Sequence, residues 1–247
     1  YFSSDKIALA VSGARLADGP EFQRLHNVVE GLCIASGLPK PAVYVVNDSA
    51  PNAFATGRNP KHAAIAVTTG LLEVMNRVEL EGVIAHELSH VKNYDILVST
   101  IAVTAVGAVA LLSDFARWGM IFGGGRRRGN ANSGGNPLGA ILALVGFVFI
   151  IFAPIAAQLM QLAVSRKREL LADASGVLMT RYPPGLISAL EKLKDDRAVI
   201  SHGARSTAQL WIETPLDTRP DAKGHWLNRA FATHPPLDER IKILQEM

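Results

Sequence analysis

Two histidines and a glutamate stand at a spacing that suits zinc chemistry. His86, Glu87 and His90 form a His-Glu-x-x-His pattern inside a stretch that we expect to be helical. Residues four apart lie on one helical face, so both imidazoles can reach one metal ion, with the glutamate beside them. Zn²⁺ takes two such ligands, one further protein ligand and a water. The pattern predicts metal-assisted hydrolysis, with Glu87 as the base that moves the proton of the water to the leaving amine. The alternative is a helix with two surface histidines.

The third zinc ligand must come from elsewhere in the chain. Asp95 is too close on the same helix, and Asp114 lies across an apolar run. The next acid, Glu169, forms a pair with Asp173 at the i,i+4 spacing of a helix. Glu169 can bind the metal, and Asp173 can orient a ligating histidine from behind. The alternative is a solvated helix face on which both acids pair with the arginines before them.

Short elements must position these residues. The helix with the two histidines is expected to begin near Val78, with Glu79 and Glu81 in its first turn, where the helix dipole favours acids. Three short strands separated by turn residues are expected before it: 43–47, 53–56 and 63–67. Other helices are expected over 1–38, 166–180, 186–193 and from about 236, with a long irregular connection over 200–230.

Charged residues are distributed unevenly. They make up only 19% of the 247 residues, whereas soluble domains contain roughly a quarter. The shortage falls between 96 and 165, where 96–113 and 138–164 contain no charge, and the longer run exceeds the roughly 20 residues that cross a bilayer. We therefore predict a transmembrane hairpin over 96–165, between two parts of one catalytic domain at 1–95 and 166–247. For the shorter run, a buried core helix is the alternative.

The charge balance excludes one class of function. The whole formal charge of +3 lies in the 96–165 segment, and the remaining residues balance. No basic face is left for a phosphate backbone, so we expect no nucleic-acid partner. The single Cys33 cannot form an internal disulfide, which fits a reducing compartment. Positive charges are equally frequent at both ends of the hairpin, so they do not set its orientation.

The motifs together resemble the HtpX-type membrane zinc metalloproteases, relatives of the CaaX prenyl-protein proteases. The resemblance spans almost the whole chain and rests on four motifs in the expected order: 86–90 with Asn93 and Asp95, 165–169 with Asp173, 52–57, and 234–236 with Arg240. It implies that His86, His90 and Glu169 hold one zinc ion and that Glu87 is the general base. The expected fold is a mainly helical α+β zincin with a small sheet, interrupted by the hairpin.

The resemblance also implies how substrate is bound. Asn52, Ala53 and Phe54 would hold the substrate backbone, and an exposed edge strand there can pair with an extended peptide. His234 and Arg240 would line the site opposite zinc, with His234 donating to the oxyanion. The plainer alternatives are an ordinary edge strand, a turn that leads into a helix, and a surface arginine.

These expectations describe a zinc endopeptidase that degrades misfolded membrane proteins in protein quality control. Its partners would be an extended peptide and the lipid bilayer, and it would be a multi-pass protein of the bacterial cytoplasmic membrane with its site facing the cytosol. The family typically has two further membrane helices ahead of the domain, so we expect a fragment that begins at Tyr1. The alternatives are a CaaX prenyl-protein endoprotease and a non-catalytic zinc-binding module, against which the intact Glu87 argues.

Overall fold

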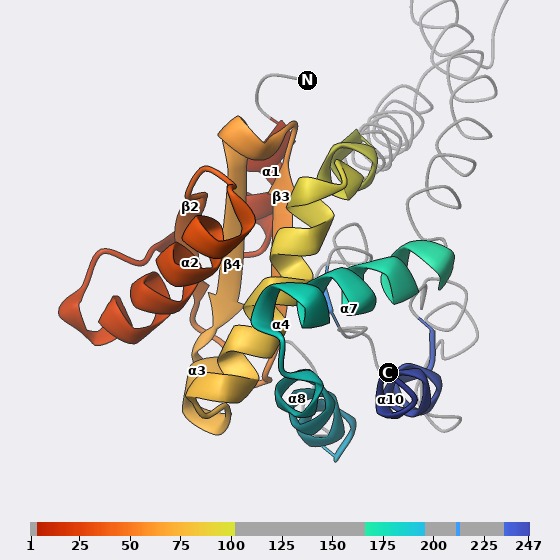
Figure 1. The fold of residues 1–247 in the computed structure, drawn as a ribbon. Coiled ribbons are helices and arrows are strands. Elements are labelled where there is room, and N and C mark those ends of the chain that lie inside the picture. The colour runs from red at the N-terminus through yellow and green to blue at the C-terminus, as the bar shows by residue number, and fades with distance from the viewer. Residues whose placement is uncertain (1–3, 102–165, 196–210, 213–234) are drawn as a thin grey trace, which may run out of the picture.

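The computed structural model describes residues 4–101, 166–195, 211–212 and 235–247 (Figure 1). Its strands are β1 (Arg15–Leu16), β2 (Ala42–Val46), β3 (Ala53–Gly57) and β4 (Ala63–Thr68). Its helices are α1 (Ser4–Val11), α2 (Gln23–Ser36), α3 (Thr69–Val74), α4 (Arg77–Lys92), α7 (Arg166–Thr180), α8 (Pro183–Asp195) and α10 (Leu237–Gln245), with 3-10 turns η1 (Pro20–Phe22) and η2 (Pro60–His62). The described part is therefore mainly helical with a small sheet, as the sequence predicts.

The four strands form one mixed sheet in the order β1-β2-β4-β3. β2 and β4 are parallel, and the other neighbours are antiparallel. The three expected strands are confirmed, whereas β1 and α3 were not foreseen. The expectation of helix throughout 1–38 is wrong, because Gly13 turns the chain with φ of 66° after α1 and leads it into β1.

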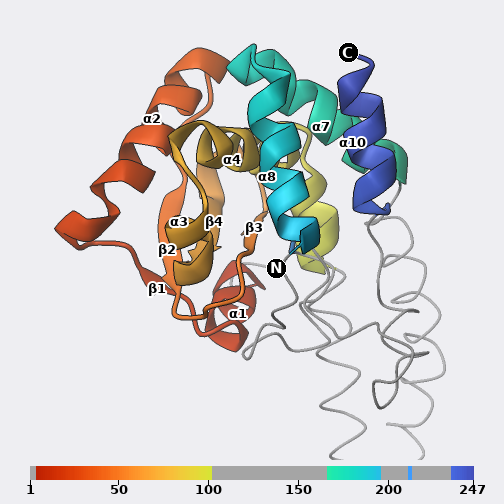
Figure 2. The same ribbon diagram turned by 90° about the horizontal axis from the view of Figure 1, so that it is seen from below.

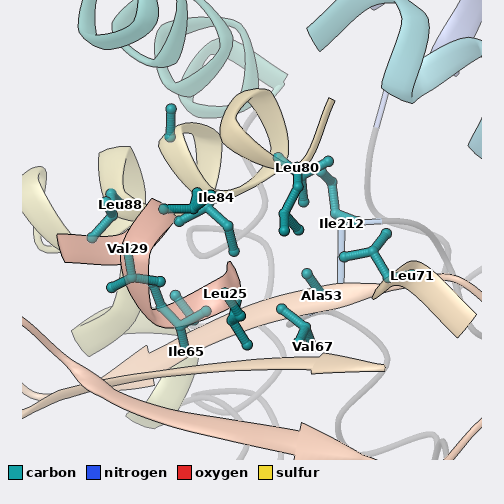
Figure 3. Close-up of a cluster of buried hydrophobic side chains, with 14 of the residues drawn as sticks. Leu25, Val29, Ala53, Ile65, Val67, Leu71, Leu80, Ile84, Leu88 and Ile212 are labelled. Carbon is teal, nitrogen blue, oxygen red and sulfur yellow. The ribbon is translucent and has the colours of Figure 1, made fainter. Parts of the chain in front are cut away.

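Both faces of the sheet are covered. Along β4, Ile65 and Val67 point into the main core beneath α2 and α4 (Figure 3), while Ala64 and Ala66 point into a second cluster with α1. This alternation follows from the two-residue period of a strand. Because both sides of the sheet are packed, all residues of β3 are buried as well.

The helix α4 is fixed at its N-terminal end. Asn76 and Glu79 form a reciprocal capping box, in which each side chain accepts a hydrogen bond from the other's backbone N–H. Glu79 also accepts hydrogen bonds from Ser188 and Lys192 of α8, both at 2.7 Å. A side chain at Gly82 would lie 2.8 Å from the α8 backbone, so glycine allows the two helices to touch. These contacts set the position of the helix that carries both histidines.

Most of the expected hairpin lies outside the described residues. Its first described residues, 96–101, belong to a helical stretch over 95–101 that follows α4 after a short turn. Among the residues that the structure describes, no helix is long and apolar enough to cross a membrane.

Candidate zinc site

The site forms where α7 packs against α4 (Figures 1 and 2). Gly176 of α7 makes this approach possible, because a Cβ atom there would lie only 3.0 Å from the backbone nitrogen of His86. Glu169 and Asp173 precede it on the same helix and face the two histidines of α4. Residues more than 70 positions apart in the sequence are thus brought together by two helices in backbone contact.

The three expected ligand side chains converge. The Nε2 atoms of His86 and His90 lie 3.2 Å apart, and each lies 3.6 Å from an oxygen of Glu169. Ligand atoms about 2.0–2.2 Å from a tetrahedral zinc ion lie about 3.4 Å from one another. The separation of the two nitrogens is close to that value, the two 3.6 Å separations run to different oxygens of Glu169, and one ligand atom from each residue lies within 4.8 Å of the others. Burial and ligand type also suit Zn²⁺. The residues present therefore fit the metal.

His86 is held by two further side chains, and the three form what we call the buried triad. The Nδ1–H group of His86 donates to Asp173 at 2.8 Å. Arg240, from α10, donates to both oxygens of Asp173, at 2.8 and 2.6 Å. None of the three side chains is more than 1% exposed. The unused Nε2 of His86 is thereby turned towards His90 and Glu169.

The charges of the buried triad support one another in the metal-free protein. Burial and the charge of Arg240 would lower the pKa of His86, but the carboxylates of Asp173 and Glu169 outweigh them and raise it to about 9. Burial would raise the pKa of Asp173, but Arg240 and His86 lower it to about 2. A metal ion at Nε2 would take the place of the proton that this raised pKa of His86 favours.

His90 has its own pair of supporting side chains, and we call this set the rim triad. Its Nδ1–H group donates to Asp95 at 2.9 Å, and Arg168 Nε donates to the other oxygen of Asp95 at 2.8 Å. The side chains of His90, Asp95 and Arg168 are 15%, 10% and 24% exposed. From the sequence, Asp95 was not expected to be a ligand, and no other role was predicted for it. The sequence feature that could have indicated this role is an acidic residue five positions after His90. The acid can reach His90 only because of the turn that follows α4.

Glu87 lies between the two histidines on α4 and is buried. Its charge acts on Arg240: burial would lower the pKa of that guanidinium, but the carboxylates of Asp173, Glu169 and Glu87 raise it. The surface-arginine alternative for Arg240 is thus wrong, since its side chain is fully buried. His234 lies outside the described residues.

The strand that was expected to bind substrate is at the edge of the sheet, as predicted, but its residues are buried. β3 does end the sheet, but it is buried and not exposed, because Trp211 and Ile212 lie along it. The Ile212 N–H donates to the carbonyl of Ala53 at 2.9 Å, and the Phe54 ring packs edge-on against Trp211 at 4.6 Å. Asn52 is also buried, and its side-chain oxygen accepts the N–H of Ala53.

Comparison with known proteins agrees with this geometry. The model of Peptidase family M48 matches residues 20–247. The Protease HtpX homolog of Tropheryma whipplei (strain Twist) is 50% identical over 247 residues, which cover all of this chain and 80% of the relative. The Protease HtpX homolog of Caldanaerobacter subterraneus is 48% identical over 251 residues, covering 79% of its length.

A solved structure shares the fold. The crystal structure of S. mikatae Ste24p matches 98% of this chain and 55% of its own, with a TM-score of 0.52 and 18% identity. The likeness at this identity concerns the fold alone. From the family match and the ligand geometry together, the chain belongs to peptidase family M48 and is a zinc metalloprotease.

Proposed function

We propose that the protein is a membrane-bound zinc endopeptidase that cleaves misfolded membrane proteins as part of protein quality control. The observation that carries this proposal is that Glu169 of α7 meets His86 and His90 of α4, the helix that also bears Glu87. The relatives named as HtpX proteases, which match the chain throughout, support the same activity.

Each residue of the site has a role in the proposed reaction. His86, His90 and Glu169 would hold the metal, and bound zinc would supply Lewis acidity to the attacking water and to the peptide carbonyl. Glu87 takes the proton of that water and passes it to the nitrogen of the leaving amine. Asp173 keeps His86 in the tautomer that presents Nε2 to the metal. His234 is proposed to donate to the oxyanion, and Arg240 to act through Asp173.

Replacement of Glu87 tests this mechanism. Glu87→Gln keeps the size of the side chain but cannot accept the proton, so we expect cleavage of a membrane-protein substrate to fall by roughly 10²–10⁴-fold. Zinc content, measured by metal analysis, should stay at one per chain. Glu81→Gln is the matched control, since Glu81 lies on the same helix and pairs with Arg77. Full activity of Glu87→Gln would contradict the proposed base.

We also propose that the substrate binds as an extended strand along β3. The Ala53 carbonyl accepts from Ile212, so a substrate strand would take over this hydrogen bond and move Trp211 aside. The test uses a Glu87→Gln protein in which the other two tryptophans, Trp118 and Trp226, are replaced by phenylalanine, so that only Trp211 remains. Peptide binding should shift the Trp211 emission to longer wavelength, because the ring is 0% exposed without peptide. Binding with unchanged emission would place the substrate elsewhere.

For the location, we propose a multi-pass protein of the bacterial cytoplasmic membrane with the zinc site facing the cytosol. The charge-free runs 96–113 and 138–164 support membrane insertion. In a Cys33→Ser background, a cysteine at Asn130, between the runs, should react with an impermeant maleimide added outside the cell. A cysteine at Lys167 should react only after permeabilisation. The reverse pattern would overturn the orientation.

The choice of substrate separates the proposed activity from that of a CaaX prenyl-protein endoprotease. We expect faster cleavage of an unmodified membrane protein than of a prenylated CaaX peptide. The opposite preference would favour the CaaX activity. A zinc-loaded protein that cleaves neither would favour a non-catalytic binding module.

A further inference from the structure

Two described segments meet at the point where the chain leaves for the 96–165 segment and returns from it. Asp95 starts the helical stretch 95–101, and Arg168 lies in the first turn of α7. The Nε atom of Arg168 donates to Asp95 Oδ1 at 2.8 Å, and Nη2 of Arg168 contacts the same oxygen. This contact joins residues 73 positions apart and closes the two ends of the segment against each other.

The same carboxylate also contacts a zinc-ligand histidine. Asp95 uses Oδ1 for Arg168 and Oδ2 for the Nδ1–H group of His90, at 2.9 Å. The other nitrogen of that ring lies 3.6 Å from Glu169. Because a carboxylate is planar and rigid, the position of Arg168 fixes the direction in which Oδ2 faces His90. The orientation of the imidazole therefore depends on the contact between the two ends.

The backbone before Asp95 is shaped for this arrangement. α4 ends at Lys92, and Tyr94 adopts φ of 60°, in the left-handed region that few residues with side chains occupy. The turn brings Asp95 beside His90, one helical turn back along α4. Such a conformation persists where the surrounding contacts hold it, and here those contacts are the bonds of Asp95 to His90 and Arg168.

We propose that Asp95 and Arg168 are positioning residues that couple zinc binding by His90 to the contact between Asp95, at the start of the stretch 95–101, and Arg168 of α7. When the two ends are together, Asp95 holds the His90 ring with Nε2 towards the metal. When they separate, Asp95 loses Arg168 and His90 loses its fixed acceptor, so zinc is held less tightly. This inference rests on the proposed zinc ligands and adds two residues to which no role in the reaction was assigned.

The test measures zinc affinity of the full chain in detergent micelles by competition with a chelator. We expect Arg168→Gln to weaken zinc binding by about 10–100-fold, the usual effect of losing a partner behind a ligand. Arg168→Lys should recover part of this loss, because lysine keeps the charge but not the planar fork. Lys167→Gln is the matched control, because it removes one positive charge from the neighbouring exposed position and should change nothing.

A charge exchange separates positioning from simple helix packing. In the double variant Asp95→Arg with Arg168→Asp, the attraction between the two ends returns, but an arginine stands beside His90 in place of the carboxylate. Thermal unfolding of the metal-free protein should therefore recover relative to the single variants, whereas zinc affinity should not. Recovery of both would show that the pair acts only through packing and would overturn the proposal.

Two further outcomes are decisive. If Arg168→Gln binds zinc as tightly as Lys167→Gln, the proposal is wrong. Asp95→Asn, which is isosteric, guards against a folding failure: it should retain the melting behaviour of a folded chain and still lose zinc affinity. A failure of the proposed zinc site itself can be told apart from a failure of this inference. In that case His86→Ala would bind zinc as tightly as the unaltered protein.

Discussion

The two histidine ligands sit on one helix, yet the protein supports them in two different ways. His86 is backed by Asp173 and Arg240, all within the core, whereas His90 is backed by Asp95 and Arg168 at the edge of the domain. The order of contacts is the same in both triads: an imidazole donates to a carboxylate that an arginine holds. The triads differ in burial and in how the arginine holds the carboxylate: Arg240 donates to both oxygens of Asp173, whereas Arg168 contacts one oxygen of Asp95.

Burial decides what each triad does. Removing one partner of a buried ion pair strongly destabilises the fold, because the desolvation of the remaining charge is no longer compensated. A pair near the surface can exchange its partner for water at little cost. The buried triad therefore behaves as a fixed part of the core, and the rim triad as a contact that can open while the fold persists.

Removal of each arginine gives the largest contrast. Arg240→Ala leaves the buried carboxylate of Asp173 with His86 but without its arginine, which should lower the free energy of unfolding by about 3–5 kcal/mol. Arg168→Ala should lower it by about 1 kcal/mol or less, because Asp95 can be hydrated. Unfolding by denaturant of the metal-free protein in micelles measures both. Equal losses would contradict the distinction between the triads.

The pH dependence of the metal-free protein sharpens the same comparison. The pKa of His86 is raised to about 9 in the folded chain, from about 6.5 in the unfolded chain. Its stabilising charge is fully present below pH 6.5 and is lost as pH rises towards 9, so unfolding should become easier across that window. Asp173→Asn should flatten this slope in melting temperature against pH, whereas Asp95→Asn should leave it in place. A steep slope in Asp173→Asn would mean that Asp173 is not the main cause of the raised pKa of His86.

The buried triad was partly predictable from sequence. His86 follows from its four-residue spacing to His90, and Asp173 from its i,i+4 relation to Glu169, because helices convert such spacings directly into shared faces. That Arg240 contacts Asp173 depends on how α10 packs beside α7, a long-range contact that no local spacing encodes. Its expected place in the site rested on resemblance alone.

The rim triad was not predictable in the same way. Asp95 appeared too close to His90 to take part, since a straight helix would carry it round to another face. The left-handed turn at Tyr94 changes that geometry, and tyrosine gives no local signal for it. Likewise, the edge strand β3 was correctly placed, but its burial depends on Trp211 and Ile212, which arrive from far along the chain.

Widening the contact between α4 and α7, next to the buried triad, should lower the stability by a smaller amount. In Gly176→Ala, the new Cβ would lie 3.0 Å from the nitrogen of His86, so the helices must move apart slightly. We expect a loss of about 1–3 kcal/mol in unfolding free energy, as for other overpacked contacts, together with weaker zinc binding. Gly31→Ala on α2 is the matched control: nothing lies within 4 Å of its Cβ, and it should stabilise the helix. A gain in Gly176→Ala would mean that the helices do not touch there.

The smallest expected change in unfolding free energy comes from Tyr94, in the turn that precedes Asp95 of the rim triad. The left-handed conformation of Tyr94 destabilises the folded chain by about 1–2 kcal/mol. Its half-exposed side chain makes little packing that would offset this cost. Tyr94→Gly removes that strain but adds about 0.5–1 kcal/mol of backbone entropy to the unfolded chain. The net change in unfolding free energy should therefore lie between zero and a gain of about 1.5 kcal/mol, with zinc affinity unchanged. A clear loss of stability would show that the tyrosine ring itself holds Asp95 in place, and the rim triad would then need a fourth member.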